Sequence, residues 1–260
     1  MNIYKETIGV MAAASVRKAL FARTETLKYL ILSMLAGAYV GFGIILIFTI
    51  GAPVAEAASP FLKTLMGASF GIALTLVIIA GAELFTGNNM IMVIGNMEGK
   101  CSLGDTAVVW IASYIGNLIG ALFFAGLCVH TGFFKGGHLP EFMAKVAVSK
   151  MTAPASELFV RGILCNMLVC LAVWMSARVK EDIAKFASIF WCLFAFIACG
   201  YEHSVANMSL LAMPLFAGAG DAVTWSGYAR NLAYVSAGNI VGGSLMIGAA
   251  YAYVSKGRTN

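Results

Sequence analysis

The chain has 260 residues, of which 60% are hydrophobic and 11% are charged, and its formal net charge is +5. Charged residues make up about a quarter of an ordinary soluble domain, so this composition excludes a soluble globular protein and predicts a polytopic membrane protein. The positive charge requires no nucleic-acid partner, because basic residues at the cytoplasmic edges of membrane spans produce such an excess.

The first segment, residues 1–26, is interrupted by charged residues such as Lys5 and Arg17, so it does not read as a secretory signal. Apolar residues recur at helical spacing from Tyr4 to Leu20, which predicts an amphipathic helix lying along the cytoplasmic interface. Such a helix can anchor the chain, or it can act as a mobile plug of the inner mouth. Both interpretations stay open.

Six uncharged or nearly uncharged runs follow, and they predict an all-α membrane protein with six crossings. We expect a single integral domain over residues 27–255 and a short cytoplasmic tail at 256–260. The predicted spans cover residues 29–50, 64–97, 107–129, 162–177, 186–220 and 231–254.

The distribution of basic residues predicts the orientation. With six crossings both termini share a side, and we expect that side to be cytoplasmic because it carries most of the 17 Lys and Arg residues. The protein is therefore expected in the inner (plasma) membrane. The residues assigned to the cytoplasmic side are Lys5, Arg17, Lys18, Arg23, Lys28, Lys100, Arg178, Lys180, Lys185, Lys256 and Arg258; the other side has Lys63, Lys135, Lys145, Lys150, Arg161 and Arg230.

Two of the spans are too long for one straight helix, which would reach about 50 Å against a hydrocarbon core of about 30 Å. One contains Glu83 within residues 81–88, and the other contains Glu202 and His203 within residues 200–207. Both segments read Gly-x-Glu-x-x-x-x-Asn. We predict that each span breaks there and that Glu83 and Glu202 cap the broken backbone.

The two breaks belong to a predicted inverted repeat. The motif Gly-Asn-[Leu/Ile]-[Ile/Val]-Gly occurs at 116–120 and again at 238–242, at nearly the same offset as the two breaks. This indicates that residues 27–130 and 155–254 form two units of three spans, and an odd number of spans makes the second unit enter from the opposite side. The glycines predict close helix packing, and the intramembrane residues Asn117, Asn166 and Asn239 are expected to face protein or a polar pore.

Converging half-helices predict a site for an anion, because a helix N-terminus carries about half a positive charge. His203 lies at this point, and its unperturbed pKa of about 6.5 would let it exchange a proton near neutral pH. The alternative is a neutral, hydrogen-bonded histidine that holds the break. Apolar neighbours such as Leu84 and Phe196 predict narrow constrictions, which a bare anion crosses far less easily than its neutral acid does. Lys150 is either an anchor at the membrane surface or an anion attractor.

Other classes of function fit less well. The six cysteines show no metal-type spacing and predict no disulfide framework, so we expect no metal and no cofactor. A haem-binding redox subunit needs paired intramembrane histidines, a hydrolase has only Ser204 beside His203 at poor geometry, and a water channel normally has Asn-Pro-Ala at both breaks. We therefore expect no enzymatic activity, and leave open a passive channel or a proton symporter.

The chain resembles the formate/nitrite transporter family at Gly-Ala-Glu-Leu-Phe-Thr-Gly (81–87) and Gly-Tyr-Glu-His-Ser-Val-Ala-Asn-Met (200–208), and the similarity extends over nearly all of its length. The resemblance implies an aquaporin-like six-helix protomer, a homopentamer in the lipid bilayer, one pore in each protomer, and small monovalent anions and protons as partners. It implies that Thr86 and His203 form a central polar pair, that Lys150 attracts anions, and that Asn166 and Asn239 lie near the pore. The constriction residues that it implies are Phe70, Leu74, Leu84 and Phe196.

Substrate preference is read only weakly from these motifs. Thr152-Ala-Pro-Ala155 and the neighbourhood of Cys165 and Asn166 look more like the nitrite and hydrosulphide branches of the family than the formate branch. Nitrite, hydrosulphide and formate therefore all remain as candidates.

Overall fold

The computed structural model describes residues 4–256 and is helical throughout, with no strand in that range. Of the tail predicted at 256–260, residues 257–260 lie outside the described residues. Six helical segments are long and apolar enough to cross a membrane, which confirms the predicted number of spans. They are α2 (Thr26–Glu56), α3 to η1 (Leu62–Gly81), α6 (Leu103–His130), α8 (Ala155–Arg178), α9 (Asp182–Cys199) and α11 to α12 (Trp225–Ser255).

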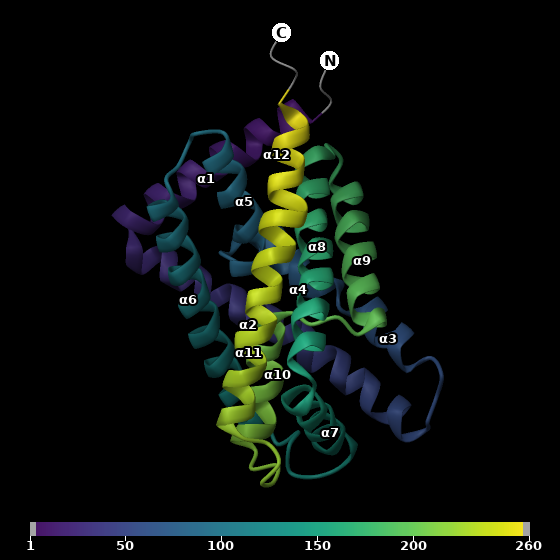
Figure 1. The fold of residues 1–260 in the computed structure, drawn as a ribbon. Helices are drawn as coiled ribbons and strands as arrows, with labels where there is room; N and C mark the ends of the chain where they lie inside the picture. The colour runs from purple at the N-terminus through teal and green to yellow at the C-terminus, as the bar shows by residue number, and fades with distance from the viewer. Residues whose placement is uncertain (1–3, 257–260) are drawn as a thin grey trace.

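The second and sixth of these segments contain several pieces. The second consists of α3 (Leu62–Ser69), α4 (Gly71–Thr75) and the π-helical turn η1 (Leu76–Gly81); the sixth consists of α11 (Trp225–Val241), the π-helical η2 (Gly242–Ala249) and α12 (Ala250–Ser255). Figure 1 shows the sixth as one continuous yellow rod along the molecule. A π-helical turn changes the local pitch without ending a helix.

Both predicted breaks are present. The second span ends at Gly81 with φ +90°, and the fifth ends at Cys199 and is followed by Gly200 with φ +75°; both glycines are in the left-handed region that favours glycine. Short extended segments follow, and the half-helices α5 (Phe85–Met97) and α10 (Ser204–Phe216) then begin. The chain therefore re-enters helical structure twice inside the protein.

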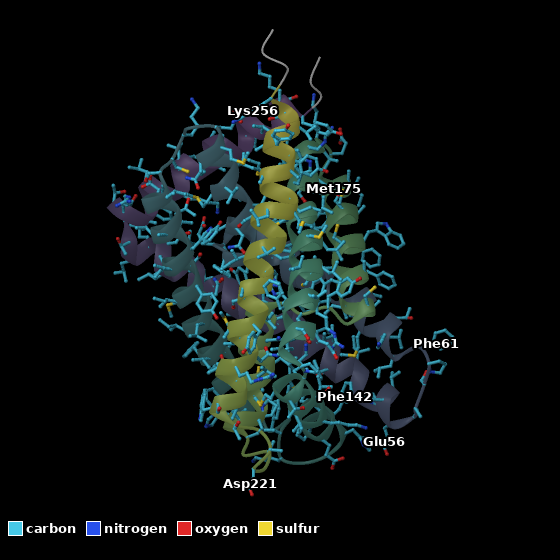
Figure 2. The ribbon with its side chains drawn as sticks, viewed as in Figure 1. Glu56, Phe61, Phe142, Met175, Asp221 and Lys256 are labelled. Carbon is cyan, nitrogen blue, oxygen red and sulfur yellow. The ribbon has the colours of Figure 1, made fainter. Side chains whose placement is uncertain are left out.

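Two further helices lie at opposite ends of the molecule. α1 (Lys5–Thr24) lies across the end that also carries α12, and α7 (His138–Thr152) lies near the other end (Figure 1). Figure 2 places Lys256 at the first end and Asp221 at the second. An edge-to-face contact between Tyr4 and Tyr251, with ring centroids 5.6 Å apart, joins the beginning of α1 to α12. The first and last described elements therefore share one side of the protein, as predicted.

The helix α1 packs against the protein along one face. Its buried side chains, which include Ile8, Met11 and Ser15, face α5 and α6, and its other face is exposed. The buried face of the predicted amphipathic helix α1 therefore packs against the half-helix α5. The six cysteines are all free, so no disulfide contributes to the fold.

Close helix packing depends on the predicted glycine motifs. A Cβ at Gly120 of α6 would lie 1.9 Å from the carbonyl oxygen of Met34 on α2, and one at Gly238 of α11 would lie 2.1 Å from that of Phe159 on α8. These two helix pairs are the most extensive contacts between elements. Small residues permit this approach in lipid, where no hydrophobic gain brings helices together.

Gly120→Ala is expected to destabilise the protein by about 1–3 kcal/mol, because the added methyl group forces α2 and α6 apart. Gly126→Ala on the same helix is the matched control, since a Cβ there meets nothing within 4 Å; alanine there should be neutral or stabilise by up to about 1 kcal/mol. Thermal unfolding of the detergent-solubilised variants compares the two. Equal unfolding temperatures would contradict the packing argument.

Candidate functional site

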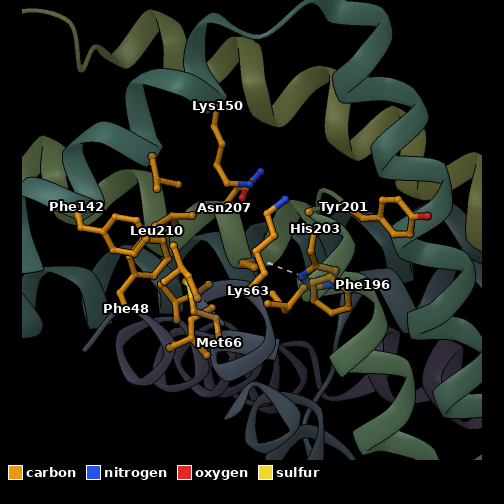
Figure 3. Close-up of a pocket in the computed structure, with 17 residues that line it drawn as sticks. Phe48, Lys63, Met66, Phe142, Lys150, Phe196, Tyr201, His203, Asn207 and Leu210 are labelled. Carbon is orange, nitrogen blue, oxygen red and sulfur yellow. Dashed lines mark hydrogen bonds between the residues drawn. The ribbon is translucent and has the colours of Figure 1, made fainter. Parts of the chain in front are cut away.

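A first cavity, the Lys150 cavity, opens on the α7 side of the molecule and has a volume of about 250 Å³. Its walls come from α2, α3, α7, α9 and α10, and it reaches inward to His203 (Figure 3). The wall is almost entirely apolar, and its cationic residues are Lys63 and Lys150. This cavity therefore leads from one end of the protein to the second break.

A second cavity, the Lys18 cavity, lies on the α1 side and has a volume of about 500 Å³. It is lined by η1, by the first break with Glu83, and by Asn88 on α5. Lys18 on α1 lies in its wall. It therefore reaches the first break from the opposite end.

A small central chamber lies between the two cavities. The space available to a water molecule in it is about 10 Å³, which is room for about one. Phe196 and His203 line both this chamber and the Lys150 cavity, while Leu74 and Leu84 line both this chamber and the Lys18 cavity. The three spaces thus follow one another through the protein.

Apart from His203, the residues that line the chamber are apolar. Phe70 and Phe196 meet edge to face, with ring centroids 5.4 Å apart, and both are buried. Leu74 and Leu84 are buried on the Lys18 side of the chamber. All four constriction residues that the resemblance implied therefore line the chamber.

Thr86 and His203 connect the two breaks, and of the two only His203 is among the described residues that line the chamber. The Nε2 atom of His203 lies 2.9 Å from Oγ1 of Thr86, and both side chains are buried. The Nδ1 atom of His203 accepts a hydrogen bond from the backbone amide of Ala206 at 3.1 Å, which caps the start of α10. Because Nδ1 is an acceptor there, the neutral ring carries its proton on Nε2 and donates it to Thr86.

Glu202 is held by two side chains. The ammonium group of Lys150 lies 2.7 Å from each carboxylate oxygen, and Nδ2 of Asn207 donates to Oε2 at 2.6 Å. The Glu202 side chain is only 3% exposed. A buried carboxylate requires a paired charge, so Lys150 neutralises the second break.

The first break contains the equivalent group. Lys18 donates to Oε2 of Glu83 at 2.6 Å, and Nδ2 of Asn88 lies 3.3 Å from the same oxygen. Asn88 also donates to the hydroxyl of Tyr29 at 3.1 Å. Each Gly-x-Glu-x-x-x-x-Asn motif therefore forms a Lys–Glu–Asn group, although the two lysines come from α1 and α7.

The broken backbone itself is held by two asparagines. Asn117 of α6 accepts from the amide of Phe85 at 2.9 Å, and it donates to the carbonyl groups of Ser33 at 2.7 Å and Glu83 at 2.8 Å. Asn239 of α11 repeats this pattern.

Asn239 accepts from the amide of Ser204 at 2.9 Å, and it donates to the carbonyl groups of Gly162 at 2.8 Å and Glu202 at 3.0 Å. Within residues 4–256 the carboxylates of Glu83 and Glu202 accept from side chains, and no backbone amide donates to either of them. The structure therefore differs from our expectation that these carboxylates cap the breaks. The amide side chain suits the position better, because it both accepts and donates.

Asn166 of α8 forms further hydrogen bonds near the two breaks. Its Nδ2 atom lies 2.6 Å from the carbonyl oxygen of Asn239, 3.0 Å from Oδ1 of Asn89 and 3.2 Å from the carbonyl oxygen of Thr86. It is fully buried and does not line any of the three cavities described above. Asn166 therefore positions Thr86 through the backbone.

The site also contains Lys18, Asn88 and Asn207, which were not among its predicted residues. The two asparagines are part of the repeated motif, so their position five residues after each glutamate was an available signal. Lys18 gave no such signal, because a lysine on an interfacial helix looks like any other cytoplasmic basic residue.

Comparisons with known proteins identify the family. The model described as formate/nitrite transporter matches residues 5–253. The nitrite transporter NirC of Salmonella typhimurium is 46% identical over 256 residues, which cover 97% of this chain and 93% of that protein. NirC of Escherichia coli is 45% identical with the same coverage.

Two solved structures have the same fold. A chain described as an FNT family ion channel superposes with a TM-score of 0.89 at 46% identity and covers 95% of this chain and 98% of its own. A pentameric formate channel with formate bound superposes with a TM-score of 0.77 at 26% identity, covering 90% and 98%. With its six spans and two broken helices, the chain belongs to the formate/nitrite transporter family of membrane transport proteins.

Proposed function

We propose that the protein passes small monovalent anions of weak acids across the membrane, and that nitrite is the first candidate. The observation that carries the proposal is the succession of two cavities and a central chamber through the middle of the chain. Nitrite is placed first because two relatives with 46% and 45% identity are named nitrite transporters. Formate and hydrosulphide are the other candidates.

The apolar chamber favours the neutral acid over the anion. Moving a bare ion into such a space costs tens of kcal/mol by Born solvation. Protonating an acid whose pKa lies three or four units below the surrounding pH costs only about 4–5 kcal/mol. We therefore propose that the anion is drawn into a cavity, takes up a proton, crosses between Phe196 and Leu84 as the neutral acid, and releases the proton beyond.

The hydrogen bonds of His203 favour water in the cavity as the proton source. The neutral ring has one proton, on Nε2, and giving it up would leave an imidazolate anion. A second proton would have to enter at Nδ1, where the amide of Ala206 is bound. The proposed role of His203 is therefore to donate from Nε2, with Thr86, to the group that enters the chamber.

The same proposal includes orientation and assembly. We propose that the α1 side faces the cytoplasm of the inner membrane, because α1 and the ends of the spans near it carry most of the basic residues. The Lys18 cavity is then cytoplasmic and the Lys150 cavity exterior. A homopentamer with one pore in each protomer is proposed by analogy with the pentameric formate channel. The equivalent Lys–Glu–Asn groups support the proposed inverted repeat of residues 27–130 and 155–254.

Purified protein in liposomes tests the function. We expect nitrite, formate and hydrosulphide to enter faster than in protein-free vesicles, and sulfate, a divalent anion, to be excluded. A pH dye inside the vesicles separates passage of the neutral acid, which acidifies the interior, from passage of the anion, which does not. Equal nitrite uptake with and without protein would refute the proposal.

A further inference from the structure

The Lys150 cavity has two lysines in its wall, and they are in different electrostatic situations. Lys63 lies at the start of α3, and Lys150 near the end of α7. Both side chains extend into the cavity, as Figure 3 shows. None of the described residues that line this cavity is acidic, although the Glu202 carboxylate is paired with Lys150.

The positive charge of Lys150 is neutralised by the Glu202 carboxylate. Its ammonium group lies 2.7 Å from both oxygens of Glu202, so the pair has no net charge. Its backbone carbonyl also accepts from Nδ2 of Asn231 at 3.0 Å, which fixes the end of α7. Lys150 is thus a positioning residue that holds α7 to the second break.

Lys63 has no such partner. In the part of the chain that the structure describes, its ammonium group takes part in no hydrogen bond and no ion pair, and the residue is exposed. Three further charged residues near this end, Glu56, Glu141 and Lys145, line a neighbouring cavity that shares Phe142 with the Lys150 cavity. Among the described residues that line the Lys150 cavity, Lys63 is therefore the cation without an ion-pair partner.

An uncompensated charge at the mouth of an apolar cavity acts over a long range. Its field extends over the Debye length, about 30 Å at 0.01 M ionic strength and about 3 Å at 1 M. Low-dielectric walls focus the field and raise the local concentration of the opposite charge. A neutral ion pair has a much weaker field at the same distance.

We infer that Lys63 is the residue that concentrates the anion at the entrance of the Lys150 cavity, so that it determines how fast substrate enters from that side. This inference rests on the proposed function and adds a residue to it. It separates two tasks: Lys63 attracts the anion, and Lys150 holds the break that the anion then meets.

The test uses full-length protein in liposomes sorted into two orientations by the accessibility of an N-terminal tag. Lys63→Gln is expected to lower nitrite entry from the Lys150 side about three- to tenfold at 0.01 M ionic strength. At 1 M of an impermeant salt the variant and the wild type should have equal rates. Entry from the Lys18 side should be unchanged, and Lys63→Arg should match the wild type.

Lys135→Gln is the matched control, because Lys135 is an exposed lysine of the same end that lines none of the three cavities. At 0.01 M ionic strength it should lower nitrite entry less than Lys63→Gln does, because Lys135 lies outside the cavity wall, and at 1 M it should match the wild type. Equal rates for Lys63→Gln and wild type at low salt would overturn the inference, and so would a loss that is the same at low and high salt or from both sides. A wild-type protein that passes no nitrite, formate or hydrosulphide would instead overturn the proposed function, and this inference with it.

Discussion

His203→Phe is expected to lower nitrite flux at least about a hundredfold, which is a typical loss when one preorganised donor is removed from a water-excluded site. The variant loses the Nε2 donor to Thr86 and the Nδ1 cap on the amide of Ala206. A phenyl ring also adds to the apolar wall beside Phe196, so nothing polar receives the entering group. Initial rates of nitrite entry into liposomes measure the effect, and gel filtration checks assembly.

His203→Asn separates the two tasks of this ring. Asparagine is a good N-cap residue, so this variant should keep most of the stability that His203→Phe loses through the cap, about 1 kcal/mol, yet its flux should remain low. His130→Phe is the control, since His130 is exposed and lines none of the three cavities. A His203→Phe protein with the flux of the wild type would remove His203 from the mechanism.

Asn239→Leu is expected to cause the largest loss of stability, about 2–6 kcal/mol, because it leaves two buried backbone groups without partners at about 1–3 kcal/mol each. These groups are the amide of Ser204 and the carbonyl group of Glu202, whereas the carbonyl group of Gly162 keeps its hydrogen bond within α8. For a chain of this size such a loss corresponds to a fall of about 4–24 °C in the unfolding temperature. Thermal unfolding of the solubilised protein provides the measurement.

Asn117→Leu should reproduce that loss, since Asn117 makes the same three hydrogen bonds at the first break. Asn96→Leu is the comparison variant. Asn96 is only half-buried at the end of α5, where water can replace its contacts with Cys101 and Thr106. A fall no larger at Asn239 than at Asn96 would show that the breaks are held by something else.

The positions of the two broken helices could be predicted from the sequence. Each break follows from a span too long for the bilayer and from a glutamate inside it, and the structure confirms both at Gly81 and Gly200. The contact of His203 with Thr86 could not be derived from spacing, because the two residues lie 117 positions apart and only the family resemblance paired them. Sequence periodicity predicts which face of a helix is buried and where the helix ends. It does not predict which residues of different helices contact each other.

The same limit explains the different placement of Glu83 and Glu202. A carboxylate beside a broken helix is a reasonable cap when only its own segment is considered. In the fold, Asn117 and Asn239 reach the breaks from neighbouring helices, and the lysines of α1 and α7 occupy the carboxylates instead. The asparagines were visible in the Gly-Asn motifs, but their three backbone contacts each depend on tertiary packing.

The size of the central chamber has a consequence for the energy supply of the cell. Protons move through proteins along unbroken files of hydrogen-bonded water, and a space for about one molecule between pairs of apolar residues interrupts such a file. Hydronium on its own meets the same Born barrier as any other bare ion. If the substrate crosses as the neutral acid, as proposed, a proton crosses only with the acid that carries it, and a membrane with many copies of this protein keeps its electrochemical gradient when no such acid is present.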